Sequence, residues 1–256
     1  MKAAVLLVSF GTSYKQARGK SLDCICNDLA QTNKDVFVYQ AYTSNIIIKK
    51  LAKSNIKIYN VHEAVEEILK ENVQCLYVVS THIIPGHEYN KLLGMLERYK
   101  SEFKSLKIAT PLLYEKADCD KTVSLLNKIF DFNKNYEYVL MGHGTDADAN
   151  IRYEEMNEAF EKAGLKNVHI ASVEAKPDLD DAIAKMRKRK NIEKVIVHPF
   201  MVVAGDHANN DMAGEGESYV SVLKECGYNT EAIVKGLGEY PEFRKIYVNK
   251  LTEMIE

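Results

Sequence analysis

Two similar segments occur in the chain, one near the start of each half: VLLVSFGT at residues 5–12 and YVLMGHGT at residues 138–145. Each is an apolar, partly β-branched run that ends in a glycine-containing loop, as a buried strand followed by a turn does. Their glycines, Gly11 and Gly144, are offset by 133 residues (144 − 11). A second pair of similar segments, YVVSTHIIPGHE at 77–88 and IVHPFMVVAGDH at 196–207, is offset by 119 (205 − 86). These matches predict an internal duplication.

The duplication divides the chain into two halves, 1–133 and 134–256, and the second half carries most of the candidate metal ligands described below. The second offset is 14 residues shorter than the first (133 − 119). An additional turn or helix at residues 46–60 of the first half would account for the difference. We expect the two halves to face each other across a cleft.

Short apolar runs alternate with longer amphipathic ones along the whole chain. The predicted strands are 3–9, 36–41, 75–80, 106–109, 138–141, 168–173, 194–197 and 230–234. The predicted helices are 14–29, 61–70, 89–103, 150–163, 178–189 and 241–255. Strands that alternate with helices of this length pair in parallel through right-handed crossovers, with helices on both faces of the sheet. The predicted fold class is α/β, with two similar doubly wound parallel-sheet halves.

Composition narrows the kinds of partner. The 256 residues carry a formal net charge of -2 and a pI near 6.4, so no global positive field favours nucleic acid or an anionic membrane. The five cysteines are scattered and include no CxxC pair, which indicates reduced side chains rather than a disulfide framework or a structural zinc site. The apolar stretch 3–8 is too short to span a membrane. We therefore expect a cytoplasmic protein.

Three metal-ligand side chains follow successive predicted strands of the second half. His143 follows strand 138–141, Glu174 follows strand 168–173, and His207 follows the segment 194–203 through Gly205. In parallel sheets, ligands bind beyond the carboxyl ends of the strands. Two imidazoles and one carboxylate suit a borderline divalent cation and leave coordination positions open. A lone histidine at a strand end is more often a surface residue. The prediction of a metal site therefore rests on the three side chains together and not on any one of them.

The first half offers a smaller polar cluster, consisting of His82, His87 and Glu88 in the segment THIIPGHE. Glu88 corresponds to His207 in the duplication, which makes it a candidate for an additional ligand or a catalytic proton acceptor. A carboxylate that stabilises the start of a helix through the helix dipole is an equally good interpretation of Glu88.

Two loops rich in small residues follow the matching strands. Backbone N–H groups at such strand-to-helix junctions can receive anions, but the loops lack the P-loop lysine and the full GxGxxG spacing, so carboxylate binding is favoured over nucleotide binding. Apolar residues continue beyond two other strands, and they either extend the core or form flat walls for a planar ligand. The candidate ligand-binding residues are Phe10, Gly11, Thr12, Ser13, Tyr14, Ile84, Met201 and Val202.

Six motifs together resemble the anaerobic cobalt chelatases, the sirohydrochlorin cobaltochelatases of the class II chelatase superfamily. The motifs are VSFGTSY, the segment 42–47 (YTSNII), HIIPGHEY, MGHGT, VEAKPD and MVVAGDHANNDM. They occur in family order from Met1 to about Pro241, and AGDHANNDM is quite specific. His87 departs from the pattern, because some relatives have an acidic residue there.

The resemblance implies two similar α/β halves and insertion of Co2+ into sirohydrochlorin, or a closely related tetrapyrrole, during cobalamin synthesis. It implies that His143 takes macrocycle protons and binds metal, that Glu174 and His207 complete the metal site, and that Glu88 lies nearby. Cobalt would be a substrate, and no organic cofactor is expected. The alternatives are a ferrochelatase or nickel chelatase acting on a related macrocycle, and a carrier of metal or tetrapyrrole that performs no reaction. The sequence does not set the number of subunits, and a homo-oligomer is compatible with it.

Overall fold

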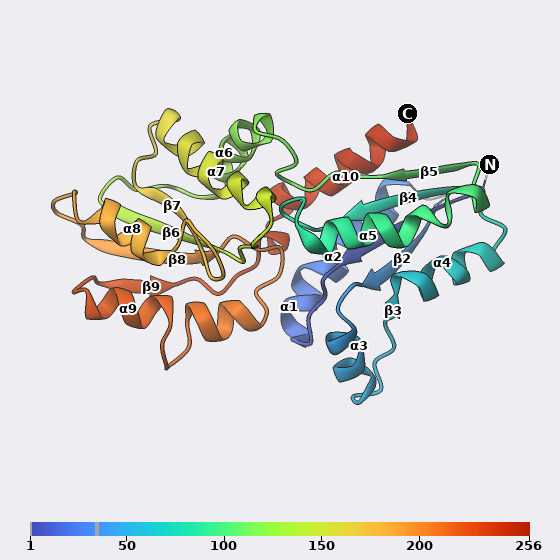
Figure 1. Cartoon of the computed structure of the whole chain (residues 1–256), viewed down its shortest axis with the longest axis horizontal. Coiled ribbons are helices and arrows are strands. Elements are labelled where there is room, and N and C mark those ends of the chain that lie inside the picture. The colour runs from blue at the N-terminus through green and yellow to red at the C-terminus, as the bar shows by residue number, and fades with distance from the viewer. Residues whose placement is uncertain (1, 34–35) are drawn as a thin grey trace. The chain divides into compact units, whose positions relative to one another are not determined.

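The protein is described by a computed structural model that covers residues 2–33 and 36–256. The chain forms two compact units, each with its own parallel sheet. One unit is Met1–Leu112 together with Arg244–Glu256, and the other is Leu113–Phe243. Figure 1 labels most of the helices and strands of both units along the chain.

The first unit contains a five-stranded parallel sheet in the order β3-β2-β1-β4-β5. Its central strands are fully covered: every residue of β4 is buried, as are six of the seven residues of β1. Near-continuous apolar runs of this kind are typical of parallel strands that are covered on both faces. The strands are β1 (Ala3–Ser9), β2 (Val36–Tyr42), β3 (Tyr59–Asn60), β4 (Cys75–Ser80) and β5 (Ser105–Ile108).

Helices cover both faces of this sheet. On one face, α4 (Val61–Lys70) and α5 (His87–Glu97) bury apolar side chains against alternate residues of β1 and β4. α2 (Leu22–Thr32) packs beside β1 and β2, and α10 (Pro241–Ile255) is joined to it by the ion pair Arg244–Asp28, at 2.6 Å. The shorter elements are α1 (Lys15–Lys20), α3 (Asn45–Ala52) and η1 (Lys100–Glu102).

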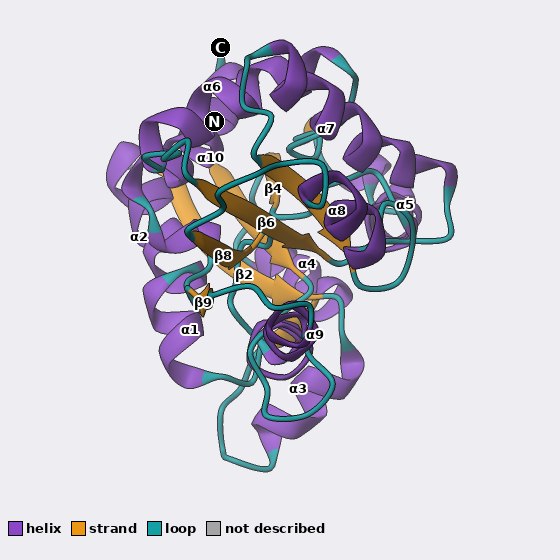
Figure 2. Ribbon diagram, turned by 90° about the vertical axis from the view of Figure 1, so that its left-hand side faces the viewer, coloured by secondary structure: helices purple, strands orange, loops and turns teal. Residues whose placement is uncertain are grey.

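The second unit contains a four-stranded parallel sheet in the order β7-β6-β8-β9. α8 and α9 bury their apolar faces in one core cluster with alternate residues of β6 and β8, while α7 packs on β7 and α6 packs on α7. Figure 2 labels β6, β8 and β9 together with α7, α8 and α9 of this unit. The strands are β6 (Tyr136–Gly142), β7 (Val168–Ser172), β8 (Lys194–Pro199) and β9 (Thr230–Ala232). The helices are α6 (Ala117–Ile129), α7 (Ile151–Lys162), α8 (Leu179–Met186) and α9 (Tyr219–Glu225), with the short turns η2 (Asp148–Asn150), η3 (Ala208–Met212) and η4 (Leu237–Glu239).

The predicted fold class is confirmed, because both units are parallel α/β layers and all eight predicted strands are present. The two sheets also match in strand order. If β1 corresponds to β6, then β2, β4 and β5 correspond to β7, β8 and β9, and β3 is the additional strand. α3 and β3 occupy the region in which the two offsets predicted an insertion.

The expectation of one helix over 14–29 is wrong, because the helix breaks at Ser21. The Ser21 hydroxyl donates to the carbonyl oxygen of Ala17, and its backbone has φ -117° and ψ -79°. A serine that bonds back to the preceding turn competes with regular helix geometry, and Gly19 weakens the helix just before it. The result is α1 followed by a separate α2.

The predicted boundary of the duplication, at 133/134, differs from the boundaries of the two compact units. α6 precedes that boundary yet packs in the second unit, and α10 follows it yet lies in the first unit from Arg244 onward. The division into halves 1–133 and 134–256, and the cleft between them, stay predictions about the duplication.

Within the described ranges, none of the helices has the length and apolar character needed to cross a membrane.

Candidate metal centre

Three elements of the second unit deliver the predicted metal ligands to one place. His143 directly follows the central strand β6, Glu174 lies two residues beyond β7, and His207 directly precedes η3 in the segment after β8. β7 and β8 flank β6 in the sheet, so three neighbouring strands present their carboxyl ends together. The loop position of each side chain follows from this parallel arrangement.

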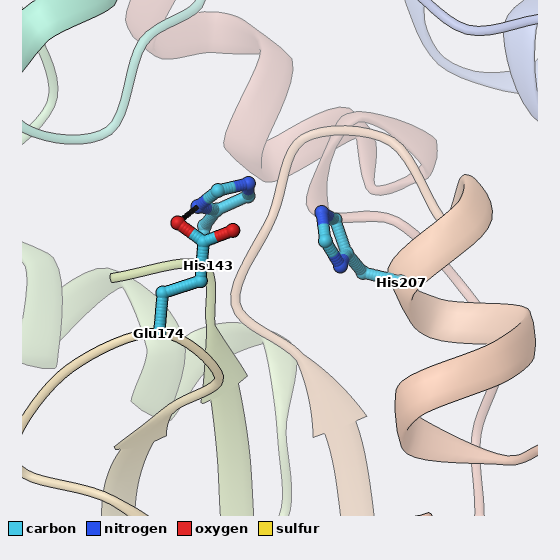
Figure 3. Close-up of side chains that lie close together, drawn as sticks. All are labelled: His143, Glu174 and His207. Carbon is cyan, nitrogen blue, oxygen red and sulfur yellow. Dashed lines mark ion pairs between the residues drawn. The ribbon is translucent and has the colours of Figure 1, made fainter. Parts of the chain in front are cut away.

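The three side chains converge closely enough to share one ion. One ligand atom from each of His143, Glu174 and His207 lies within 4.8 Å of the other two. Glu174 Oε2 is 3.4 Å from His143 Nδ1, and the two imidazole centroids are 4.5 Å apart. Figure 3 shows the carboxylate and both imidazoles directed toward one another from three separate segments. The side chains are 44%, 54% and 33% exposed, respectively, so the group is open to a second reactant.

Backbone contacts hold Glu174 beside His143. Beyond the ends of the strands, Val173 N donates to Gly142 O at 3.1 Å and Glu174 N donates to His143 O at 3.0 Å. Gly144 has φ +89°, a conformation that favours glycine, and a Cβ there would be 3.0 Å from both Ala175 N and Ser172 Cβ. Glycine therefore allows the two loops to approach this closely. The matching Gly11 of the first unit also has a positive φ, at +99°.

Tyr153 of α7 contacts the loop that contains His143 and Gly144, and it was not among the residues predicted from the sequence. Its side chain is buried, and its phenol oxygen receives the backbone N–H groups of both His143 and Gly144. Burial raises the pKa of Tyr153, so the phenol stays neutral. Its ring also packs against Gly142. The sequence carries no separate signal for this role, because Tyr153 reads as an ordinary core position of an amphipathic helix.

The donor set has a clear chemical preference. Two imidazole nitrogens and one carboxylate oxygen are suited to borderline divalent cations of the first transition row. Three protein ligands leave coordination positions for water or for another incoming ligand. With both imidazoles neutral, the group contributes one negative charge, so a bound divalent ion keeps a net positive charge that favours an electron-rich ligand.

The other predicted ligand-binding residues of the second unit lie on the segment after β8. Val202 is buried, and Met201 is partly buried against the core cluster that contains α8 and α9. Their backbone carbonyls accept from Gly238 N and Leu237 N, at 2.9 and 2.8 Å. These contacts give both residues a place in the core, and their role in binding a planar ligand stays a prediction.

The remaining predicted residues belong to the first unit. Phe10 is 48% exposed after β1, Gly11 packs against the Tyr42 ring, and Thr12 is buried and accepts from Tyr14 N at 3.1 Å. Ser13 and Ile84 are partly buried. A role of Phe10, Gly11, Thr12, Ser13, Tyr14 and Ile84 in binding a ligand stays a prediction.

Glu88 lies in the first turn of α5, also in the first unit. Its Oε1 is 3.6 Å from Lys91 Nζ, and its Oε2 is buried without a hydrogen-bond partner among the described residues. The nearby His82 is partly buried, with its Nε2 shielded from solvent, and its Nδ1 contacts Ser80 Oγ at 2.6 Å. Burial lowers the pKa of His82 to about 4, although the Glu88 carboxylate opposes this shift. A catalytic role for Glu88 stays a prediction.

Comparison with solved structures identifies the fold. SirB from Bacillus subtilis, solved with Fe3+, superimposes with a TM-score of 0.66, at 14% sequence identity, over 99% of this chain and 96% of that chain. The likeness extends over both units. The protein therefore has the two-sheet α/β fold that SirB represents.

Sequence comparison identifies the family. The model of the cobalt chelatase (CbiK) family matches residues 3–256. A sirohydrochlorin cobaltochelatase of Salmonella typhimurium is 31% identical over 100% of this chain and 97% of its own length. Sirohydrochlorin cobaltochelatase CbiKC of Nitratidesulfovibrio vulgaris is 28% identical, over 99% of this chain and 91% of its own length. The chain belongs to the cobalt chelatase (CbiK) family, and the resemblance seen in its motifs is confirmed.

Proposed function

We propose that this protein inserts Co2+ into sirohydrochlorin, with His143, Glu174 and His207 as the residues that hold the metal before transfer. The observation that carries the proposal is the convergence of these three side chains within 4.8 Å. Membership of the cobalt chelatase family, and two relatives named sirohydrochlorin cobaltochelatase, support the substrate and the metal.

Metal insertion requires a site that holds the ion but also releases it. Three exposed protein ligands meet this need better than a closed four-ligand site, because macrocycle nitrogens can enter the open positions while protein ligands leave one by one. Glu174 and His207 come from different loops, so one can let go of the ion while the other still holds it. Co2+ lies below Ni2+ and Cu2+ in intrinsic affinity, so geometry and metal supply must determine which ion is used.

The macrocycle must also lose two N–H protons for each metal ion that enters. His143 is placed to accept one of these protons, and the second passes to water, to which the partly exposed site is open. Its Nδ1 lies 3.0 Å from Gly144 O, a contact in which Nδ1 carries hydrogen, so Nε2 presents a lone pair. One nitrogen cannot bind metal and a proton together. His143 Nε2 therefore accepts a proton only after the metal has left it for the macrocycle, which couples the two transfers.

The compartment and partners follow from the same proposal. All five cysteines are free thiols, which suits the reducing cytoplasm. The tetrapyrrole is the partner we expect, with Co2+ as a second substrate, no organic cofactor and no nucleic acid.

The test is a turnover assay with the purified protein, sirohydrochlorin and Co2+, Ni2+ or Fe2+ supplied singly and in competition. We expect the macrocycle absorbance to change catalytically, with Co2+ preferred. Preference for Fe2+ or Ni2+ would identify a ferrochelatase or a nickel chelatase. Binding of metal or tetrapyrrole at one equivalent without turnover would identify a carrier, and the proposal would then be wrong.

A further inference from the structure

We propose that Asp211 is a positioning residue for His207: its carboxylate accepts the Nδ1–H of His207 and thereby presents His207 Nε2 to the metal. The two atoms, His207 Nδ1 and Asp211 Oδ2, are 2.6 Å apart. The inference rests on the proposed function, because it concerns how one ligand of that metal site is oriented.

The spacing of the segment brings the two side chains together. Ala208 and Met212 are both fully buried in the core of the second unit, four residues apart on η3. His207 and Asp211 precede them by one residue each and have the same spacing of four. Side chains four residues apart on a helical turn are neighbours, so burial of one pair places the other pair together toward solvent. Their side chains are 33% and 43% exposed.

The backbone of this turn is held at both ends. Asn209 Nδ2 donates to Gly205 O at 2.7 Å, and Asn209 N donates to the same carbonyl at 3.2 Å. At the other end, Gly214 N donates to Asn210 O at 3.0 Å. The wide, π-helical turn Ala208–Met212 thus has a defined geometry, and turns of this kind occur often at functional sites. The contact between His207 and Asp211 is therefore part of a hydrogen-bonded turn.

The chemistry gives the contact a purpose. A histidine that binds metal through one nitrogen is commonly oriented by a carboxylate on the other, which selects the tautomer and makes the ligand nitrogen more basic. The ligand group consists of His143, Glu174 and His207 and does not include Asp211. Asp211 therefore acts through His207. Without it, the His207 ring would be free to rotate and to place its proton on Nε2, where metal must bind.

The experiment measures Co2+ binding to the full chain without tetrapyrrole, by titration and by the visible absorption of bound Co2+. We expect Asp211→Ala to weaken binding about 10- to 100-fold, the range found for such partners of metal-binding histidines, and to change the spectrum. Asp211→Asn retains an oxygen that accepts the Nδ1–H, so we expect it to restore the affinity to within about threefold of the parent protein. The matched control is Glu215→Ala, which removes an exposed carboxylate from the same segment and should leave binding unchanged.

A double-mutant cycle shows whether Asp211 acts through His207. In the His207→Ala background, Asp211→Ala should have no further effect on Co2+ affinity. An additional loss in that background, or an Asp211→Asn variant as weak as Asp211→Ala, would overturn the inference, as would unchanged binding in Asp211→Ala. Failure of the proposed metal site gives a different result, in which the parent protein binds no Co2+ or His207→Ala binds it equally well, and failure of the proposed reaction alone shows as Co2+ binding without turnover.

Discussion

The imidazole rings of His143 and His207 stand nearly perpendicular to each other, with an interplanar angle of 83° and centroids 4.5 Å apart. Two imidazolium rings this close would repel each other, whereas two neutral rings can share one cation. The pair comes from loops 64 residues apart in the chain (207 − 143), so the arrangement depends on the sheet that joins β6 to β8. The geometry therefore suits two ligands of one ion.

Replacing His143 by alanine should abolish metal insertion while the fold survives. The side chain is 44% exposed, so its removal leaves no buried cavity. Loss of a positioned proton acceptor typically lowers a rate by about 10²- to 10⁴-fold, and loss of a metal ligand adds to this effect. The measurement is the initial rate of Co2+ insertion, with circular dichroism as the check on folding.

The matched control for that variant is His62→Ala, which removes a partly exposed imidazole from α4 of the first unit. We expect it to insert metal at the parent rate. Activity within a few-fold of the parent protein in His143→Ala would remove His143 from the mechanism.

Replacing Tyr153 by phenylalanine should displace the loop that carries His143 and so weaken the candidate metal site. The change leaves the backbone N–H groups of His143 and Gly144 without their acceptor. Buried donors without partners cost about 1–3 kcal/mol of stability, and the loop that carries His143 should lose its fixed position. We expect both lower stability to urea and weaker Co2+ binding.

A tyrosine of the same unit supplies the control for Tyr153. The phenol of Tyr138, near the start of β6, donates to Asp131 O at 2.9 Å and accepts from Asn133 N at 3.0 Å. Tyr138→Phe should therefore lower stability comparably but leave Co2+ affinity unchanged. Equal Co2+ affinity in the two variants would show that the Tyr153 phenol only stabilises the fold.

The convergence of the three candidate metal ligands could be predicted because parallel topology places them. Once strands are recognised before His143, Glu174 and His207, the carboxyl ends of neighbouring parallel strands must meet. Tyr153 and Asp211 could not be found in this way. Their roles depend on which backbone group or ring packs opposite them, and their positions in the sequence suit any amphipathic helix or polar turn.

The elements of the fold that were not predicted are likewise those without a clear apolar pattern in the sequence. β3 has only two residues, too few to show alternation. α6 and α9 have weak sequence patterns, and α9 is marked mainly by the capping box of Ser218 and Ser221, a local hydrogen-bond pattern rather than an apolar period. Long, fully buried strands such as β1 and β4 were predicted at their observed bounds, because continuous apolar runs leave few alternatives.

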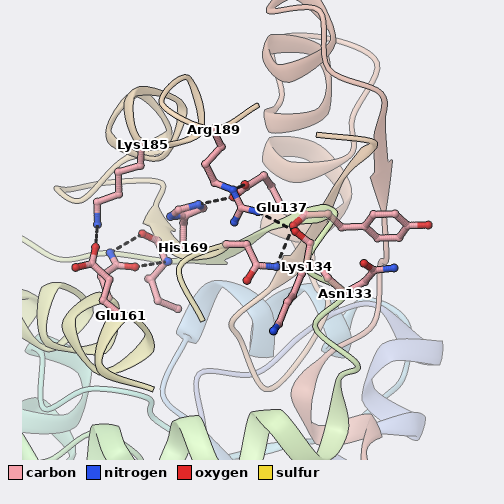
Figure 4. A network of polar contacts seen from close by, with 11 residues as sticks. Asn133, Lys134, Glu137, Glu161, His169, Lys185 and Arg189 are labelled. Atoms are coloured by element: carbon pink, nitrogen blue, oxygen red, sulfur yellow. Dashed lines mark hydrogen bonds and ion pairs between the residues drawn. The ribbon is translucent and has the colours of Figure 1, made fainter. Parts of the chain in front are cut away.

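Glu137→Gln should destabilise the second unit without affecting the metal centre. Glu137 is fully buried in β6, with Oε2 2.7 Å from His169 Nε2 and Oε1 2.8 Å from Arg189 Nε. Figure 4 shows this network. It lies near the amino end of β6, about 20 Å along the strand from His143 at ~3.3 Å per residue. Removing one partner of a buried ion pair costs about 3–5 kcal/mol, and we expect a loss of at least the lower value in urea unfolding.

An exposed ion pair of the same sheet provides the comparison. Glu231 and Lys194 are 2.8 Å apart, and the Glu231 side chain is 54% exposed. Glu231→Gln should cost no more than about 1 kcal/mol, because water screens the pair. Equal losses of unfolding free energy in Glu137→Gln and Glu231→Gln would mean that burial does not increase the contribution of the Glu137 network to stability.

Protonation of His198 should make the second unit less stable below neutral pH. His198 is buried in β8, where Nε2 contacts Tyr240 OH at 3.0 Å and Nδ1 contacts Pro199 O at 2.9 Å. Burial lowers the pKa of His198 from 6.5 to about 4, the carbonyl of Pro199 opposes this shift, and the nearby charge of Lys235 adds to it. Between these two pKa values, the unfolded chain binds a proton that the folded chain does not. The stabilising contribution is therefore complete above about pH 6.5 and is lost as the pH falls toward 4, by up to about 1.4 kcal/mol per pH unit.

Urea unfolding at pH 7 and pH 5 checks this sign, with His198→Gln as the variant that cannot titrate. The glutamine variant should be less stable than the parent protein at pH 7, because it packs less well in a buried strand. Between pH 7 and pH 5, however, the parent protein should lose about 1–2 kcal/mol more than the variant does. Equal losses in the two proteins would mean that the imidazole takes up its proton as easily in the folded chain as in the unfolded one. Burial in β8 would then not be what keeps His198 neutral.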